Sequence, residues 1–281
     1  MCRNGRHGEI IFRTDTDCEN LKSLFCQRNF QFDLFLLNKY ELYKISFLPH
    51  QEFNIENNQI SSLPESLFAN CINLRTVTLA RNKFSRLPNL SKLSKLTLLD
   101  ASHNEITTLP QNSEFSYAKL EKITLMSNLL SSIPAEIEKW TAIKELDLSS
   151  NQIVQIPETI GDLENLEQLK ISNNLLTSIP PSIGKLERLK VFEADENKLK
   201  SLPDNLGFCR NLEKLVLTHN LIQQLPTEIG QLKKVKSLFV GENQIFIVPP
   251  HIGMMDSLTE LYINGTESEK MSNIFKMTDF S

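Results

Sequence analysis

Residues 143–166 read IKELDLSSNQIVQIPETIGDLENL, and they contain one complete copy of the pattern that organises this chain. Leucine or isoleucine stands eight, five and three residues before Asn151, and Pro157 follows that asparagine by six residues. The same arrangement recurs along the sequence as LxxLxLxxNxIxxLPxxIGxLxx. Self-similarity at a fixed period of roughly 20 to 50 residues indicates a repeat architecture.

An asparagine marks each repeat. Successive asparagines are 22 to 24 residues apart, and a proline stands six residues after every one of them. An asparagine amide offers two donors and an acceptor, so it can satisfy backbone groups that a turn leaves unpaired. We therefore expect a structural ladder made of Asn58, Asn82, Asn104, Asn128, Asn151, Asn174, Asn197, Asn220 and Asn243.

The two apolar residues that flank one variable position in LxL predict a short strand. Alternation with period two turns the apolar residues into the core, and stacked coils would pair these strands in parallel. Because no coil can bury its apolar edge alone, stability requires neighbouring coils. Ten strands are predicted, centred on Asn54, Thr78, Asp100, Thr124, Asp147, Lys170, Glu193, Val216, Phe239 and Tyr262.

This pattern is identified as that of the leucine-rich repeat family, which implies an α/β fold. The expected architecture is a right-handed curved solenoid of about ten coils of about 23 residues. Its parallel sheet would form the concave face, with irregular or short helical turns outside.

The repeats are expected to span residues 50–266. Residues 1–49 would form an irregular N-terminal segment or cap, with a degenerate repeat at 35–49 in which Tyr43 occupies the asparagine position. Residues 267–281 would form a C-terminal cap, because Thr266 and Glu269 resemble a helix capping box with apolar residues after it. A frayed tail is the alternative for this segment, since chain ends are often poorly ordered.

Composition bounds the possible partners and compartments. The formal net charge of -4 provides no basic field for phosphate backbones, so no nucleic-acid partner is expected. No apolar stretch has the length of a membrane-spanning helix, so no membrane insertion is expected. Five cysteines without a C-x-x-C pair favour a reducing compartment. We expect a cytoplasmic protein, with the nucleus as a second location, that is a monomer on its own.

The sequence contains no residue pattern typical of catalysis or cofactor binding. The motifs GxSxG, GxxxxGK[ST] and HExxH do not occur, and the 9 glycines leave few positions for a phosphate-binding loop. His103 and His219 precede equivalent asparagines, but five coils separate them, so they cannot share a metal ion. Cys209 takes a position that is leucine in other repeats, which predicts a buried core residue. We expect no enzyme activity, no cofactor and no metal ion.

The strand positions that face away from the core remain available for binding. In the last three repeats they hold Val216, Phe239 and Tyr262, although the scaffold requires no apolar residue there. An aromatic centre within a charged rim is typical of protein-binding patches. The alternative is that the C-terminal tail covers this edge and buries Tyr262. The predicted charged rim consists of Lys170, Glu193, Asp195, Glu196 and Glu242.

Several stretches resemble one branch of the family more closely. They are ENNQISSLPESL (56–67), TLARNKF (78–84), ISNNLL (171–176), ADENKLKSLPDNL (194–206), LTHNLIQQLPTEIG (217–230) and GENQI (241–245). In this order they resemble the second half of the solenoid of the suppressor-of-Clear family, the intracellular scaffolds of Ras and MAP kinase signalling. The resemblance covers residues 50–266, and the early coils of that family have no counterpart here.

The resemblance implies a non-catalytic scaffold or regulatory subunit. Members of that family hold a GTP-loaded Ras-type GTPase together with the catalytic subunit of protein phosphatase 1, and thereby promote removal of an inhibitory phosphate from Raf kinase. A second hypothesis is a regulatory leucine-rich repeat fragment of a larger signalling enzyme, because such repeats also adjoin kinase, cyclase or phosphatase domains. A third is a structural spacer without a selective partner.

Overall fold

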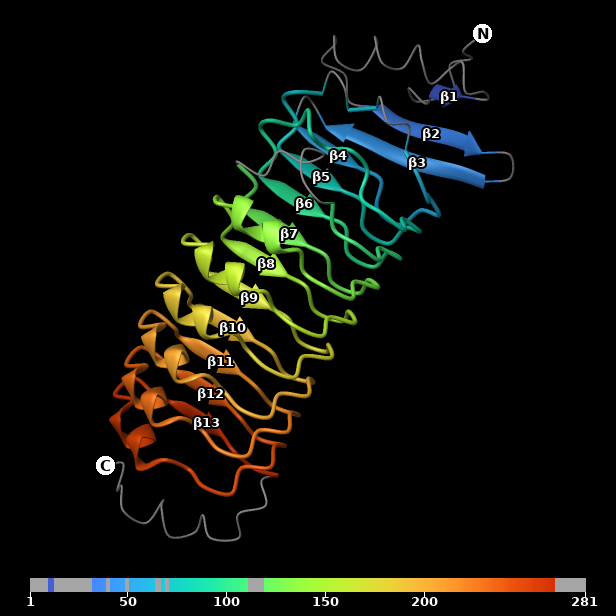
Figure 1. Ribbon diagram of the computed structural model, residues 1–281. Coiled ribbons are helices and arrows are strands. Elements are labelled where there is room, and N and C mark those ends of the chain that lie inside the picture. Colours follow the sequence, from blue (N-terminus) through green and yellow to red (C-terminus); the bar gives the residue numbers. More distant parts are fainter. Residues whose placement is uncertain are drawn as a thin grey trace. The chain divides into compact units, whose positions relative to one another are not determined.

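The structure of the protein is a computed structural model that describes residues 51–63, 67–68, 71–110 and 119–265 with their side chains, and 10–12, 32–38 and 41–48 as backbone. The chain divides into two compact units, Met1–Gln152 (unit 1) and Ile153–Ser281 (unit 2). Within each unit, short strands alternate with loops or short helices (Figure 1). The expected C-terminal cap or tail, residues 267–281, lies outside the described residues.

All ten predicted repeat strands are present, and each is three residues long. Unit 1 contains β4 Glu52–Asn54, β5 Thr76–Thr78, β6 Leu98–Asp100, β7 Lys122–Thr124 and β8 Glu145–Asp147. Unit 2 contains β9 Gln168–Lys170, β10 Val191–Glu193, β11 Lys214–Val216, β12 Ser237–Phe239 and β13 Glu260–Tyr262. Within each unit, neighbouring repeat strands pair in parallel and in register.

The strand centres lie one residue earlier than the sequence predicted. In β8 the buried middle residue is Leu146, and the expected centre, Asp147, is the last residue of the strand. The strand ends early because the chain bends soon afterwards: Ser150, just before the ladder asparagine, adopts a positive φ of 56°. The equivalent residue of every other asparagine repeat also has a positive φ, between 52° and 59°.

The N-terminal segment differs from the expected degenerate repeat at 35–49. Strand β1, Ile10–Phe12, pairs in parallel with β2, Phe32–Asn38. Strand β3, Glu41–Leu48, is antiparallel to both β2 and β4, whereas a repeat strand pairs in parallel. Tyr43, expected at a turn, lies within β3 opposite Leu36. The difference follows from the length of the two strands. Segments of 7 and 8 residues that are rich in aromatic and aliphatic side chains can form a long antiparallel pair, whereas the repeat strands have only three residues.

In six described coils the segment that returns from the turn forms a short 3-10 helix, whereas the described coil between β5 and β6 has none, so both the irregular and the short helical turns that the sequence predicted occur. Each described one follows the proline of its repeat, whose ring fixes φ and delays the start of the helix. An isoleucine or leucine at the third helical position is buried in the core, for example Ile183 and Leu206. The helices are η1 Ala135–Lys139 in unit 1, and η2 Glu158–Asp162, η3 Pro181–Lys185, η4 Asp204–Phe208, η5 Thr227–Gln231 and η6 Pro250–Met254 in unit 2.

Glycines set the close stacking of η2 to η6. A Cβ atom at Gly207 would overlap the backbone oxygen of Glu228 on η5 and lie 2.9 Å from its Cβ. Gly161, Gly184 and Gly230 are equally close to the helix that follows each of them. At Gly253 on η6, by contrast, an added Cβ would meet no atom within 4 Å in the part of the chain that the structure describes.

The asparagine ladder connects successive coils through hydrogen bonds. Eight of the nine side chains are buried, and Asn58 is half-buried. Asn220 shows the arrangement: its Nδ2 donates to the carbonyl oxygens of Ala194 and Leu217 at 3.0 Å, and its Oδ1 accepts from the N–H of Leu199 at 3.0 Å. One amide therefore ties its own turn to the backbone of the preceding coil.

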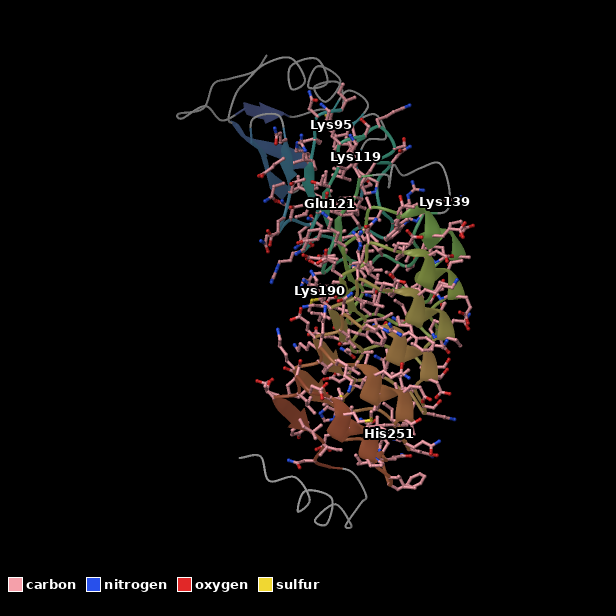
Figure 2. All side chains as sticks on the ribbon, turned by 90° about the vertical axis from the view of Figure 1, so that its left-hand side faces the viewer. Lys95, Lys119, Glu121, Lys139, Lys190 and His251 are labelled. Carbon is pink, nitrogen blue, oxygen red and sulfur yellow. The ribbon has the colours of Figure 1, made fainter. Side chains whose placement is uncertain are left out.

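A row of ion pairs lies immediately before the strands. The residues at this position alternate in charge along the sequence: Glu121, Lys144, Glu167, Lys190, Glu213 and Lys236. In unit 1, Lys144 Nζ lies 2.8 Å from the Glu121 carboxylate; in unit 2 the pair Lys190–Glu167 measures 2.6 Å. Lys236 pairs with Glu213 at 2.8 Å and lowers the pKa of that carboxyl. Figure 2 labels Glu121 and Lys190 on the strand side of their units.

Candidate functional site

The strand face of unit 2 brings most of the predicted binding residues together. The register between strands β9 and β13 aligns five third-position residues in one column: Lys170, Glu193, Val216, Phe239 and Tyr262. Their side chains point away from the core, because the middle residue of β9 to β12 is buried and its neighbours are half-exposed. Adjacent strands of a sheet are about 4.8 Å apart, so the column forms a continuous surface.

Three consecutive members of this column form an apolar cluster. Val216 and Phe239 are half-buried, and Tyr262 is 38% exposed. The Tyr262 ring packs over Gly241, since a Cβ added at Gly241 would lie 2.5 Å from the ring atom Cδ1. In the other four coils of unit 2 the equivalent position holds Ser172, Asp195, Thr218 or Asn264. Gly241 therefore provides the space in which the Tyr262 ring lies. The sequence analysis missed this feature, although an alignment of the repeats shows a glycine where the other coils of unit 2 have a polar residue.

Glu193 does not present a free negative charge, which differs from the expected acidic rim. Its carboxylate lies 2.7 Å from the Nζ of Lys214 on β11 and 3.5 Å from that of Lys170 on β9. Its side chain is only 18% exposed. Sequence reasoning missed Lys214 because it stands at the first position of its strand, in a different column from Glu193. The charge of Glu193 is thus balanced within the protein.

The other acidic residues of this face have no cationic partner within the described part of the chain. Asp195 accepts a hydrogen bond from the Ser172 hydroxyl. Glu260, at the first position of β13, accepts one from the Ser237 hydroxyl at 2.7 Å. The remaining two, Glu196 and Glu242, are exposed and occupy the left-handed turn position with φ of 52°. Both residues therefore stand in the turns that follow the carboxyl ends of β10 and β12.

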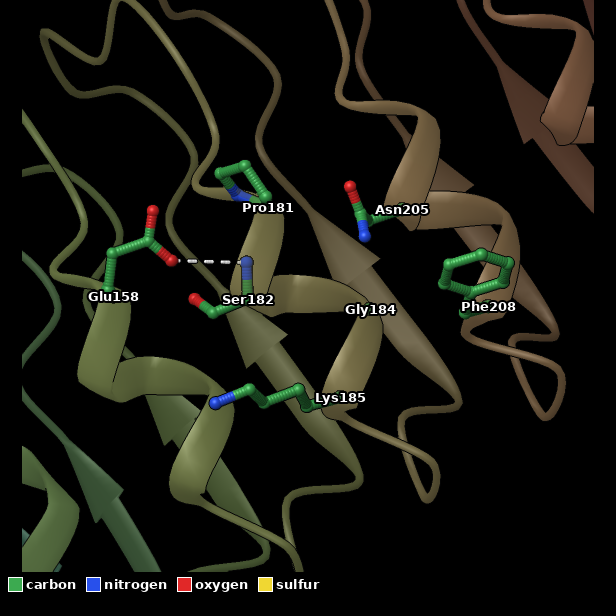
Figure 3. A pocket seen from close by; sticks show the side chains of 7 residues that line it. All are labelled: Glu158, Pro181, Ser182, Gly184, Lys185, Asn205 and Phe208. Atoms are coloured by element: carbon green, nitrogen blue, oxygen red, sulfur yellow. Dashed lines mark hydrogen bonds between the residues drawn. The ribbon is translucent and has the colours of Figure 1, made fainter.

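A second candidate is a pocket of about 320 Å³ on the helical side of unit 2 (Figure 3). The Ser182 N–H donates to the Glu158 carboxylate at 3.2 Å, while the buried Ser182 hydroxyl has no hydrogen-bond partner. The lining residues include no histidine or cysteine, so the serine has no neighbouring base of that kind to activate it. They are Glu158, Pro181, Ser182, Gly184, Lys185, Asn205 and Phe208.

Chemistry elsewhere in the described residues is sparse. No group of three or more His, Cys, Asp or Glu side chains in this part of the chain could hold a metal ion. Cys209 is buried, as predicted, and burial raises the pKa of its thiol to about 12. A thiol with such a pKa is protonated at neutral pH and is a poor nucleophile. Among the described helices, none is long and apolar enough to cross a membrane.

Comparison with known families now identifies the fold. The sequence matches the family described as leucine rich repeat over residues 51–113, 118–176 and 164–222, which together make up more than half of the chain. The chain belongs to the leucine-rich repeat family. The predicted fold class is confirmed by this match and by similar solved structures.

Two solved leucine-rich repeat structures show the same architecture. A leucine-rich repeat protein of Leptospira interrogans has a TM-score of 0.74 and 32% sequence identity, covering 78% of this chain and 55% of that one. The ectodomain of the receptor kinase GASSHO1/SCHENGEN3 of Arabidopsis thaliana, solved in complex with CASPARIAN STRIP INTEGRITY FACTOR 2, has a TM-score of 0.70 and 32% identity. It covers 78% of this chain and 28% of the ectodomain chain.

A curated relative is a much longer protein. The chain is 33% identical over 128 residues to "Probable serine/threonine-protein kinase pats1" of Dictyostelium discoideum, which corresponds to 43% of this chain and 4% of that protein. Leucine-rich repeats are in general non-catalytic interaction modules, and enzymes among the relatives are so named for separate domains. The chain therefore contains repeats of the kind that serve as protein-interaction modules.

Proposed function

We propose that this protein binds another protein through the strand face of unit 2. The observation that supports the proposal is the cluster formed by Val216, Phe239 and Tyr262, which are aligned on three neighbouring strands. These positions point away from the core, so folding gains little from large apolar side chains there. Aromatic residues at the centre of a surface patch are enriched among the residues that dominate binding energy.

The more specific proposal is a scaffold of Ras/Raf/protein phosphatase 1 signalling in the cytoplasm. It rests on the resemblance of residues 50–266 to the suppressor-of-Clear family. On this proposal the partners are a Ras-type GTPase and a protein phosphatase 1 catalytic subunit, and the chain itself contributes no catalytic group.

Binding of purified partners tests this proposal. The immobilised full chain is exposed to a Ras-type GTPase loaded with a GTP analogue or with GDP, and separately to the phosphatase catalytic subunit. We expect binding of the phosphatase, of the GTP-analogue form, or of both together, and weaker binding by the Phe239→Ala variant. Phe208→Ala removes an exposed phenylalanine from η4 on the helical side and is the matched control. Failure of both partners to bind the parent chain would contradict the signalling proposal.

A second candidate function is that of a regulatory segment within a larger signalling enzyme. The relationship to the Dictyostelium kinase supports it, since the chain corresponds to only 4% of that protein. A full-length transcript distinguishes the two: coding sequence for a kinase, cyclase or phosphatase domain in frame with these repeats would favour this candidate over a free scaffold.

A further inference from the structure

We propose that the face of unit 2 selects a basic segment of its partner that places one large apolar side chain on the Val216–Phe239–Tyr262 cluster. This inference rests on the proposed function, because it specifies the chemistry of a partner at the same face. It follows from the geometry of the cluster and from the balance of charges around it.

The apolar cluster offers a defined contact for one side chain. Val216, Phe239 and Tyr262 follow one another in register, and Tyr262 is exposed whereas the other two are half-buried. Because Gly241 lacks a side chain, the Tyr262 ring lies close over the backbone of Gly241, two residues after the end of β12. The result is an apolar surface of three aligned side chains, against which a bulky residue on the partner can pack.

The charges around the cluster favour a basic partner. Two lysines, Lys170 and Lys214, face five carboxylates, and both lysines pair with the same one, Glu193. The four other carboxylates have no cationic partner within the described part of the chain. They are Asp195, Glu196, Glu242 and Glu260. An acidic segment would meet unbalanced repulsion here, whereas lysine or arginine on a partner would supply the missing countercharges.

The carboxylates lie on both sides of the apolar cluster, which suits a partner segment in which one apolar residue has basic neighbours. Glu196 and Glu242 emerge from the turns at the carboxyl ends of their strands, in the coils of β10 and β12, and Glu260 lies at the opposite end of β13. The aromatic column runs between these two edges. Basic residues on both sides of one anchor would therefore each approach a carboxylate.

Short synthetic peptides test this chemistry with the full chain. The probe is a fluorescein-labelled peptide of lysine and arginine with tryptophan at its centre, and binding is measured by fluorescence anisotropy over a range of salt concentrations. One companion peptide has serine in place of tryptophan, and another has glutamate in place of the basic residues. We expect the first peptide to bind, the serine peptide to bind about 30-fold more weakly, and the glutamate peptide not to bind.

Substitutions on the strand face of unit 2 test whether the tryptophan peptide binds there. Phe239→Ala should weaken binding of the tryptophan peptide by about 30-fold. Gly241→Ala should weaken it as well, because the added methyl would overlap the Tyr262 ring and lie 2.8 Å from the backbone oxygen of Asn264, so the ring and the chain around it must shift. Glu242→Lys should weaken binding and reduce its dependence on salt. The controls Phe208→Ala and Glu164→Lys, exposed outside the face, should change nothing.

The outcomes separate this inference from the function on which it rests. Equal binding of the tryptophan and serine peptides, or an equal loss in Phe208→Ala and Phe239→Ala, would overturn the inference. If a purified protein partner requires Phe239 while no basic peptide binds, the face is correct and the basic chemistry is wrong. If Phe239→Ala affects neither peptide nor partner, the proposed site is also wrong. Melting curves for each variant show whether a loss reflects unfolding.

Discussion

Asn220 illustrates how much of this fold depends on single side chains. Its amide nitrogen donates to three carbonyl oxygens, those of Ala194, Leu217 and Thr218, and its oxygen accepts from the Leu199 N–H. The side chain is 5% exposed, so water cannot replace these bonds without opening the turn. Removing the amide leaves several buried backbone groups unsatisfied.

We predict that Asn220→Ala lowers the free energy of unfolding by about 1–3 kcal/mol, the usual cost of a buried polar group that loses its partner. Urea denaturation followed by circular dichroism measures the change. Gln223→Ala, an exposed residue three positions later, is the control and should stay within about 0.5 kcal/mol of the parent. Equal stability of the Asn220 variant and the parent would show that the ladder does not stabilise the coils.

Cys209 gives a prediction about pH. The pKa of its thiol is about 12 in the folded protein against an ordinary value of 9.0, so between these pH values the folded state holds a proton that the unfolded state has lost. The thiol therefore contributes stability below pH 9 that is lost as pH rises toward 12. In Cys209→Ala this part of the alkaline loss should disappear, although the variant is less stable at pH 7.

Iodoacetamide offers a direct check of the same thiol. The native protein at pH 8 should leave Cys209 unmodified, and the protein in denaturant should be alkylated there, as determined by peptide mass spectrometry. Rapid alkylation of Cys209 in the folded state would contradict the buried, protonated thiol.

At the scale of elements, the short helices depend on glycine for their spacing. Helices η2 to η5 each have a glycine at the fourth position that contacts the next helix, whereas no described residue lies within 4 Å of a Cβ added at Gly253 of η6. Interiors are close-packed, so an extra methyl group between two such helices forces the backbone apart.

We expect Gly207→Ala to destabilise the protein by about 1–3 kcal/mol, as overpacking typically does. Gly253→Ala introduces the same methyl group at the same helical position without a neighbour among the described residues, and it should be neutral or slightly stabilising because alanine restricts the unfolded chain. Thermal melts of the two variants side by side measure the difference. Similar melting temperatures would mean that helix stacking tolerates the added group.

The sequence predicts those elements in which the same kind of side chain recurs at the same position of each repeat. The ladder asparagines and the ten strands recur at fixed spacing, so their period alone reveals them, whereas the period did not decide between irregular and short helical turns. The partnership of Glu193 with Lys214 was not predictable in this way, because it joins different positions of neighbouring strands. The antiparallel pairing of β2 and β3 was not predicted either, because a stretch such as LYKISFLP matches the repeat pattern and is also compatible with a long strand.

At the scale of the molecule, stability comes from contacts between neighbours in the stack. Among the described elements of unit 2, substantial contacts join η2 with η3, η3 with η4, and so on to η6, and each strand with the next. In such repeat proteins stability is approximately a sum of coil and interface contributions, and opening can remain local.

Hydrogen exchange shows how far along the chain a destabilising substitution affects backbone protection. The Gly207→Ala variant should exchange amide hydrogens faster around η4 and η5, while strands β5 and β6 of unit 1 keep the protection of the parent protein. Hydrogen exchange measured by mass spectrometry on peptides from both units tests this prediction. A uniform increase across both units would instead mean that the whole chain opens as one cooperative block.

The alternating row from Glu121 to Lys236 constrains how such a chain can gain or lose repeats during evolution. Each lysine of the three ion pairs contacts the glutamate one coil earlier, so the charge pattern repeats only every second coil. Deletion of one coil containing Glu213 would bring Lys190 and Lys236 into adjacent coils, where their charges repel. Loss or duplication of two coils at once keeps every pair intact. The smallest unit of this sequence that can be copied without electrostatic conflict is therefore a pair of coils, 46 residues long, as from Glu121 to Glu167 or from Glu167 to Glu213.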